Sequence, residues 1–277
     1  MISLRTNSTA QMVQKHLNKA TNGINNCIMQ LTTGCKINSA KDNPANFAIM
    51  KNMESKLSSL NVAQDNISIG NDMLETASSN AELLIQHTSR IRDLCQQACN
   101  GTYGEDSVNA IKSEIQARLD EINRIYDSTD FNGIKIFIPD NGDERIINIQ
   151  VGVDSSESSR IGVNTALNYE RIDSVDDLNI TDSSVLDRID GMLNSLTNYQ
   201  VRIGASQNRL EYAFEANEIT SENLTSSLST IRDADIAKVS SELIRYQILQ
   251  QACATLLSTA NQMPSIALTL LSGLNHR

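Results

Sequence analysis

The 277-residue chain has no tryptophan, and aromatic residues make up only 4% of it. Aromatic side chains anchor most globular cores, so a chain this poor in them must bury mainly aliphatic side chains between helices. Since 40% of the residues are hydrophobic, the composition favours long packed helices over a compact α/β enzyme.

Acidic residues are missing from both ends of the chain, although the formal net charge is -10. No Asp or Glu occurs in residues 1–41 or after Glu242. Carboxylates are costly to desolvate, so acid-poor ends suit the packed interior of an assembly. The acidity of the whole chain argues against nucleic acid as a partner, because phosphate binding needs clustered Lys and Arg.

Long apolar runs are absent as well. No segment approaches the roughly 18 to 20 consecutive apolar residues of a membrane span, and residues 1–41 lack the apolar region of a cleaved signal peptide. If the protein is exported, another route is expected. A mitochondrial transit peptide is disfavoured, because Arg5 is the only arginine before Arg90.

Groups that carry chemistry are few and scattered. The five cysteines are irregularly spaced, which argues against a disulfide framework. Cys95 and Cys99 have i,i+4 spacing but no nearby His or second Cys pair to complete a metal site, so we expect buried thiols. The sequence has no metalloprotease, nucleophile-elbow or phosphate-loop motif. We therefore predict no catalytic, metal or cofactor site.

Apolar residues near the N-terminus recur at alternating steps of four and three, the heptad pattern of a coiled-coil helix. They are Val13, Leu17, Ala20, Ile24, Cys27 and Leu31. Asn43 can cap a second helix, and Pro44 fits its first position because the missing N–H would be unbonded there. The same rhythm continues to residues 100–101, so this helix would extend roughly 80 Å, as a rod requires.

The middle of the chain changes its periodicity. Residues 106–126 should form a third helix antiparallel to the second, and residues 186–232 a fourth helix. Between them, alternation in residues 134–137 and 146–153, with turn residues at 139–142, predicts a small β-hairpin region.

The last segment carries another apolar stripe, at Leu249, Ala252, Leu256, Ala260, Met263, Ala267 and Leu270. Pro264 should kink or end this helix. Short amphipathic helices are marginal alone, so the two terminal stripes should pair with each other or with neighbouring copies. The expected fold class is mainly α, with long antiparallel helices in a rod-like coiled-coil bundle and a small β-hairpin region in the middle.

Several stretches resemble the sequence signatures of bacterial flagellins, in the same order and at similar separations. They are residues 31–45, 90–94, 97–102, 131–135, 231–237, 247–252 and 260–264. The resemblance covers nearly the whole chain and leaves little room for variable outer domains. The chain is therefore similar to a short, core-only flagellin.

The resemblance implies a structural, non-enzymatic subunit that polymerises into the flagellar filament for motility. It also implies unfolded export through the flagellar type III apparatus, and an extracellular place in the bacterial flagellum. The implied partners are other copies of the chain, an export chaperone, and the filament cap and junction proteins. By the same resemblance, residues 1–41 and 236–277 are terminal filament-core helices, and residues 42–180 and 181–235 are the two parts of a rod domain. The expected polymerisation seams are Val13, Leu17, Ile24, Leu31, Leu249, Leu256, Met263 and Leu270.

Host receptors that read flagellins would use positions matched by the same resemblance. The flagellin-sensing Toll-like receptor would contact Arg90, Leu94 and Glu114, an apolar contact rimmed by charge. Cytosolic sensors would contact Leu268, Leu270 and Leu271. Packing between subunits, or the last turns of a helix, explains the same residues without a receptor.

Two other functions are compatible with these features. A hook-filament junction protein shares the terminal helices and the export route, but its ends usually match the flagellin motifs less fully than residues 247–264 do. A secreted immune-modulating ligand would use the fold without building filaments, and purified protein that never polymerises would favour it.

Overall fold

Long helices carry most of the residues that the computed structural model describes. These residues are 6–140, 144–178, 180, 182 and 184–274, with the backbone alone described at Pro264 and at residues 266–274. The chain divides into two compact units, Met1–Ser55 with Asn223–Arg277, and Lys56–Glu222. The predicted boundaries at residues 41 and 235 therefore both fall within the first unit, and the four-part division stays a prediction.

Helix α1 (Ser8–Thr33) has defined signals at both ends. The side-chain oxygen of Asn7 accepts a hydrogen bond from the backbone N–H of Ala10 at 3.0 Å, which satisfies one free donor of the first turn. Gly34 ends the helix with a φ of 69°, in the left-handed region that glycine enters without strain.

Helix α2 (Pro44–Ala98) begins where the sequence predicts. Asn43 Oδ1 accepts a hydrogen bond from the backbone N–H of Asn46 at 3.1 Å, and Pro44 occupies the first helical position. Helix α3 (Glu105–Ser128) follows after a short loop, close to the predicted range of 106–126.

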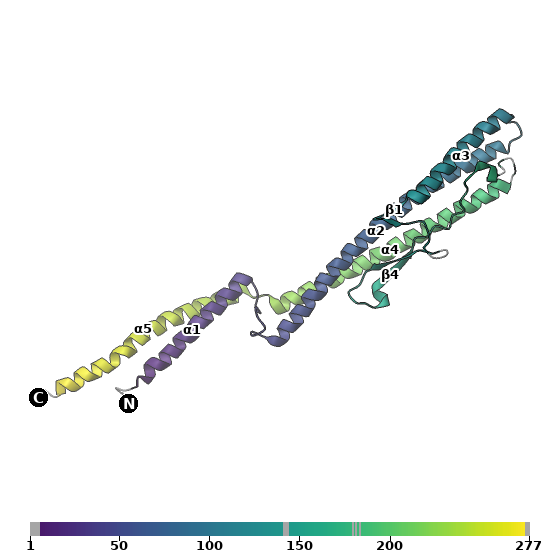
Figure 1. Cartoon of the computed structure of the whole chain (residues 1–277). Coiled ribbons are helices and arrows are strands. Elements are labelled where there is room, and N and C mark those ends of the chain that lie inside the picture. Colours follow the sequence, from purple (N-terminus) through teal and green to yellow (C-terminus); the bar gives the residue numbers. More distant parts are fainter. Residues whose placement is uncertain (1–5, 141–143, 179, 181, 183, 275–277) are drawn as a thin grey trace. The chain divides into compact units, whose positions relative to one another are not determined.

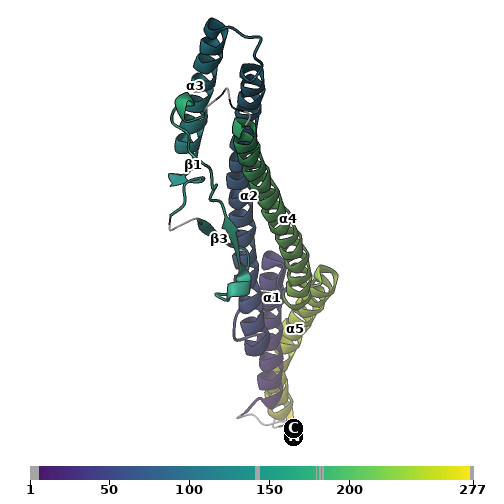
Figure 2. The ribbon, with the colours of Figure 1, turned by 90° about the vertical axis from the view of Figure 1, so that its right-hand side faces the viewer.

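The second compact unit is built from α2, α3 and α4 (Ser184–Arg232), which share one apolar core. Side chains along all three helices are fully buried, among them Leu74, Ile122 and Ile203. Polar contacts between α2 and α4 join Arg92 to Asp190 and Gln200 to Glu82, so these two helices run antiparallel. Figures 1 and 2 show α4 beside α2 along this unit. The mainly α, antiparallel packing expected from the sequence is confirmed.

The strand pairing differs from the predicted hairpin. Strand β1 (Asp130–Phe131) pairs with β2 (Ile134–Lys135), and β3 (Ile146–Gln150) pairs with β4 (Arg160–Asn164). Both pairs are antiparallel. The prediction that residues 134–137 pair with 146–153 was therefore wrong, because residues 134–135 pair with the adjacent residues 130–131 and leave residues 146–150 to pair with 160–164.

The turn between β1 and β2 is tight. Its two central residues, Asn132 and Gly133, have φ values of 50° and 79°. Positive φ at both positions is the requirement of a type I′ hairpin turn, which Asn-Gly satisfies well. A short 3₁₀ turn at Glu157–Ser159 lies between β3 and β4, and another at Val175–Leu178 lies between β4 and α4.

Helix α5 (Ile236–Leu274) continues through Pro264, so of the two predicted effects of this proline the end of the helix is excluded and the kink stays a prediction. Proline costs a helix one backbone hydrogen bond, and a helix this long tolerates that loss. Within the described part of the chain, no helix is both long and apolar enough to cross a membrane.

Candidate interaction surfaces

The terminal helices α1 and α5 pack against each other as an antiparallel pair, which Figure 1 shows. At the end of the pair where α1 begins, Asn7 Nδ2 donates a hydrogen bond to the carbonyl oxygen of Ala260 at 2.7 Å. Further along, Gln250 Nε2 donates to Thr21 Oγ1 at 3.1 Å. The predicted pairing of the two ends of the chain is therefore present within one subunit.

The residues of α5 that face α1 form a stripe that we call the inner stripe. It consists of Val239, Leu243, Tyr246, Gln250, Cys253, Leu257 and Ala260, all buried or half-buried. The spacing alternates four and three without interruption, as a coiled-coil seam requires. Sequence reasoning missed this stripe although its spacing is visible, because polar Gln250 and aromatic Tyr246 interrupt its apolar character.

Most of the stripe predicted on α5 lies on a neighbouring face, although its member Ala260 belongs to the inner stripe. We call the exposed part of the predicted stripe the outer stripe. Its residues Leu249, Leu256 and Met263 are 43%, 58% and 52% exposed. They lie outside the contact with α1, so the outer stripe is not the intramolecular seam. Leu270, with the proposed sensor residues Leu268 and Leu271, falls where side chains are not described.

On α1 the predicted seam faces its partner only in part. Val13, Leu17, Ile24 and Leu31 are half-buried, while Ala20 and Cys27 between them are buried. Met12, Ile28 and Met29 on other faces are exposed.

The proposed receptor positions lie on the second unit, where α2 meets α3. Arg90 Nε is 3.4 Å from Glu114 Oε1, and Arg118 Nη2 is 3.0 Å from the same oxygen. The hydrogen bond from Arg118, with the charge of Arg90, lowers the pKa of Glu114 below its ordinary value. The surface therefore presents a paired carboxylate with two guanidinium groups.

Leu94 does not lie on that surface. Its side chain is only 2% exposed and belongs to the core that α2 shares with α3 and α4. The receptor contact at Leu94 stays a prediction, and the long Arg90 side chain reaches solvent from a helix face on which Leu94 is buried. Beside Arg90, a polar cavity of 410 Å³ is lined by Arg90, Asp93, Gln96, Gln97, Asn100 and Tyr103.

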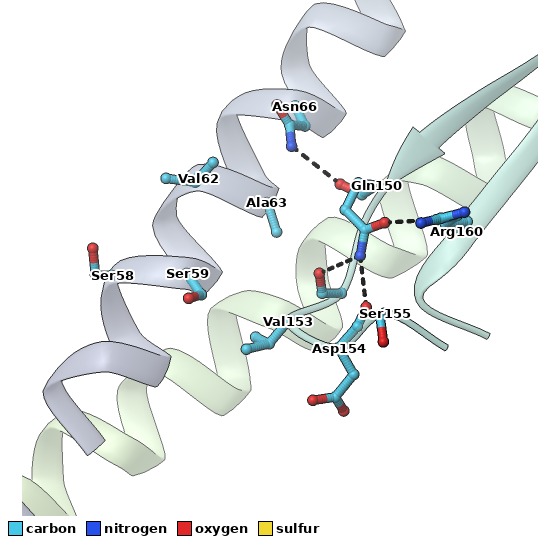
Figure 3. A pocket seen from close by; sticks show the side chains of 11 residues that line it. Ser58, Ser59, Val62, Ala63, Asn66, Gln150, Val153, Asp154, Ser155 and Arg160 are labelled. Atoms are coloured by element: carbon cyan, nitrogen blue, oxygen red, sulfur yellow. Dashed lines mark hydrogen bonds between the residues drawn. The ribbon is translucent and has the colours of Figure 1, made fainter. Parts of the chain in front are cut away.

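A second groove, of 470 Å³, separates α2 from the end of the β3–β4 pair, and Figure 3 shows its lining. Asn66 Nδ2 donates to the Gln150 carbonyl oxygen at 3.4 Å, and Gln150 Nε2 donates to the Asp154 carbonyl oxygen at 2.8 Å. Arg160 Nε donates to Gln150 Oε1 at 3.0 Å. These polar groups hold the strand pair on α2, and the lining does not pair a nucleophile with a base.

The thiols are separate and mostly covered. Cys27, Cys95 and Cys253 are buried, and Cys35 and Cys99 are half-buried, with all of them free. Burial raises the pKa of the Cys95 thiol to about 12, which keeps it protonated and unreactive. Among the described residues, no group of His, Cys, Asp and Glu could hold a metal ion.

In the first unit, paired helices carry an exposed apolar stripe, and in the second unit the grooves are lined by structural hydrogen bonds; these features are those of a helical assembly protein. The family model of the bacterial flagellin N-terminal helical region matches residues 4–141, and that of the C-terminal helical region matches residues 186–271. The chain belongs to the bacterial flagellin family. It is thus a structural subunit of the flagellar filament, and not an enzyme.

Individual relatives agree with this assignment. A flagellin of Halalkalibacterium halodurans is 34% identical over 250 residues, which cover 87% of this chain and 89% of that protein. A flagellar filament 30.7 kDa core protein of Treponema maltophilum is 30% identical over 269 residues, covering 90% and 94%. The solved structure of a flagellar hook-associated protein from Vibrio parahaemolyticus has the same fold, with a TM-score of 0.59 at 14% identity over 69% of this chain and 100% of that one.

Proposed function

We propose that the α1–α5 pair is the polymerisation surface, with the outer stripe of α5 as its main contact between copies. The supporting observation is that α5 carries more apolar faces than one subunit buries. The inner stripe packs on α1, whereas Leu249, Leu256 and Met263 stay exposed. An open helical polymer needs a surface that meets a different surface on the next copy, and an unburied stripe beside a filled seam provides one.

Seeded polymerisation of purified protein tests this proposal. Full-length protein should convert to sedimentable tubular filaments, seen by electron microscopy. Protein lacking residues 1–41 and 243–277 should stay soluble while the second unit keeps its helical circular dichroism. If the shortened protein assembles equally well, the terminal pair is not the polymerisation surface.

Export and location form a second part of the proposal. The chain would leave the cell unfolded through the flagellar type III apparatus, with an export chaperone on its C-terminal segment, and assemble extracellularly under the cap and on the junction proteins. The exposed apolar residues of α5 support a chaperone, because such a stripe aggregates easily before assembly. Mass spectrometry of protein from the medium should find residue Ile2 or Met1 at the N-terminus. Loss of a longer N-terminal segment would contradict this route.

Recognition by the flagellin-sensing Toll-like receptor is the third part. Arg90 and Glu114 would contact the receptor directly, and buried Leu94 would support them from beneath. The exposed guanidinium and carboxylate groups beside a polar cavity favour a charged interface. Reporter cells that express the receptor would measure the response.

The junction-protein alternative is compatible with the fold shared with a hook-associated protein. The fold does not distinguish the two functions, because subunits and junction proteins share terminal helices. The number of copies does distinguish them: a filament subunit makes up the whole length of the filament. Immunogold labelling confined to the filament base would favour the junction protein.

A further inference from the structure

The single glycine of α1 meets the single aromatic residue of α5. Gly23 is the one glycine between Ser8 and Thr33, and Tyr246 is the one aromatic residue between Ile236 and Leu274. A Cβ atom built at Gly23 would lie 2.8 Å from Cδ1, Cδ2 and Cε1 of Tyr246. Three ring atoms at one distance mean that the ring lies flat over the glycine, closer than any side chain there would allow.

Apolar heptads alone do not fix how two helices align along their axis. The seams of α1 and α5 repeat every seven residues, so a slip by one heptad keeps apolar residues facing each other. Such a slip moves one helix by roughly 10 Å at 1.5 Å per residue. It would also bring Tyr246 opposite His16 or Gln30, whose side chains occupy the space that Gly23 leaves open.

Contacts around the ring agree with one alignment. Gln250, one turn further along α5, donates its hydrogen bond to Thr21. The guanidinium of Arg245 lies 4.8 Å from the centroid of the Tyr246 ring, so a cation covers part of the ring. Just beyond the end of α1 and before the start of α5, the backbone N–H of Lys36 donates a hydrogen bond to the Arg232 carbonyl oxygen at 2.6 Å.

We propose that Gly23 and Tyr246 form a register lock that sets the axial alignment of α1 on α5. The lock sets the height at which the exposed apolar residues of α1, Met12 among them, stand relative to those of α5, and so determines which composite surface the pair presents. In a pair slipped by one heptad, the exposed residues of only one of the two helices would be at the right height to contact the next copy. This inference rests on the proposed assembly through the terminal pair, and makes these two residues specificity-determining for it.

The test measures the critical concentration for seeded polymerisation of the full-length chain. The variants are Gly23→Ala, Tyr246→Leu and the double variant. Gly204→Ala is the matched control, since a Cβ there has nothing within 4 Å and the residue lies in α4 of the other unit. Alanine is the better helix former, so helix propensity alone predicts that Gly23→Ala would assist assembly.

The lock predicts the opposite sign. Gly23→Ala should raise the critical concentration by about tenfold, as expected of an added methyl group in a filled contact. In the double variant, leucine at position 246 should make room for the added methyl group, so its critical concentration should equal that of Tyr246→Leu alone. The critical concentration of Gly204→Ala should equal that of the original chain. Unchanged assembly of Gly23→Ala, or a double variant no better than Gly23→Ala, would overturn the lock. If the original chain itself does not assemble, the assembly proposal is wrong and the lock has no role to play in it.

Discussion

Leu256 and Leu257 are adjacent leucines on α5 that should respond differently to the same substitution. Leu256 is 58% exposed on the outer stripe, and Leu257 is half-buried on the inner stripe against α1. Successive residues of an α-helix lie about 100° apart, so the two side chains reach different partners. Leu256→Ala should weaken assembly and leave the stability of the subunit unchanged, whereas Leu257→Ala should destabilise the α1–α5 pair.

The exposed fraction of Leu256 gives the size of the effect. Fully burying a leucine side chain contributes about 1.5–3 kcal/mol, and roughly half of that remains to be gained here, about 1–1.5 kcal/mol on assembly. Leu256→Ala should therefore raise the critical concentration for polymerisation roughly five- to tenfold. The urea-unfolding curve of the unassembled subunit should not change.

Sedimentation of seeded reactions at a series of concentrations measures the first quantity, and circular dichroism in urea measures the second. Leu257→Ala should shift the unfolding transition of the terminal helices to lower urea as well as weaken assembly. Equal effects of the two substitutions on unfolding would refute the division of α5 into inner and outer stripes.

Three further predictions concern the second unit and its surface. Ile122 is fully buried, so Ile122→Ala should cost about 2–5 kcal/mol of unfolding free energy in urea, and a loss below that range would contradict its place in the core. The hydrogen bond from Arg92 lowers the pKa of Asp190 below its ordinary 3.8, so this carboxylate stabilises the fold above that pH and the stability is lost as the pH falls through the lowered value. Asp190→Asn should flatten this acid dependence, and an unchanged pH profile of urea unfolding would contradict it. Arg90→Ala should reduce receptor-reporter activation several-fold, whereas Arg124→Ala, which removes a similar exposed arginine paired with a glutamate, should not; equal responses would contradict the receptor contact.

Helix boundaries were well predicted because their signals are local. Asn43 caps α2 and Pro44 begins it through interactions among residues three positions apart, which the sequence displays directly. The same kind of local rule predicted a kink or an end at Pro264, and the structure excludes the end. The local cost of the proline is real, but α5 continues past it, and the sequence alone does not show how far the rest of a helix compensates.

The functional faces were harder to predict, because hydrophobic periodicity identifies an apolar stripe on a helix but does not show which surface packs against it. The stripe through Leu249 and Leu256 was found, yet the contact with α1 is made by a stripe that includes Tyr246 and Gln250. The burial of Leu94 could not be predicted for a related reason, since four-residue spacing from Arg90 does not distinguish a buried side chain from one that reaches solvent.

The strand pairs show the limit for short β segments. The strongest hairpin signal, Asn132-Gly133, was read as part of a family signature rather than as a turn. Strand β4 was passed over because Ile161 and Val163 lie in a stretch rich in serine and acidic residues. Only the pairing register reveals that they face Ile149 and Ile147.

The central claim, that the outer stripe of α5 holds the filament together, is tested most directly by a helical reconstruction of assembled filaments by electron cryomicroscopy. The account predicts that Leu249, Leu256 and Met263 of one copy are buried against a terminal helix of a neighbouring copy, with the Gly23–Tyr246 contact retained inside each subunit. A reconstruction in which these three side chains face solvent, or in which α1 pairs with α5 only between copies, would contradict it.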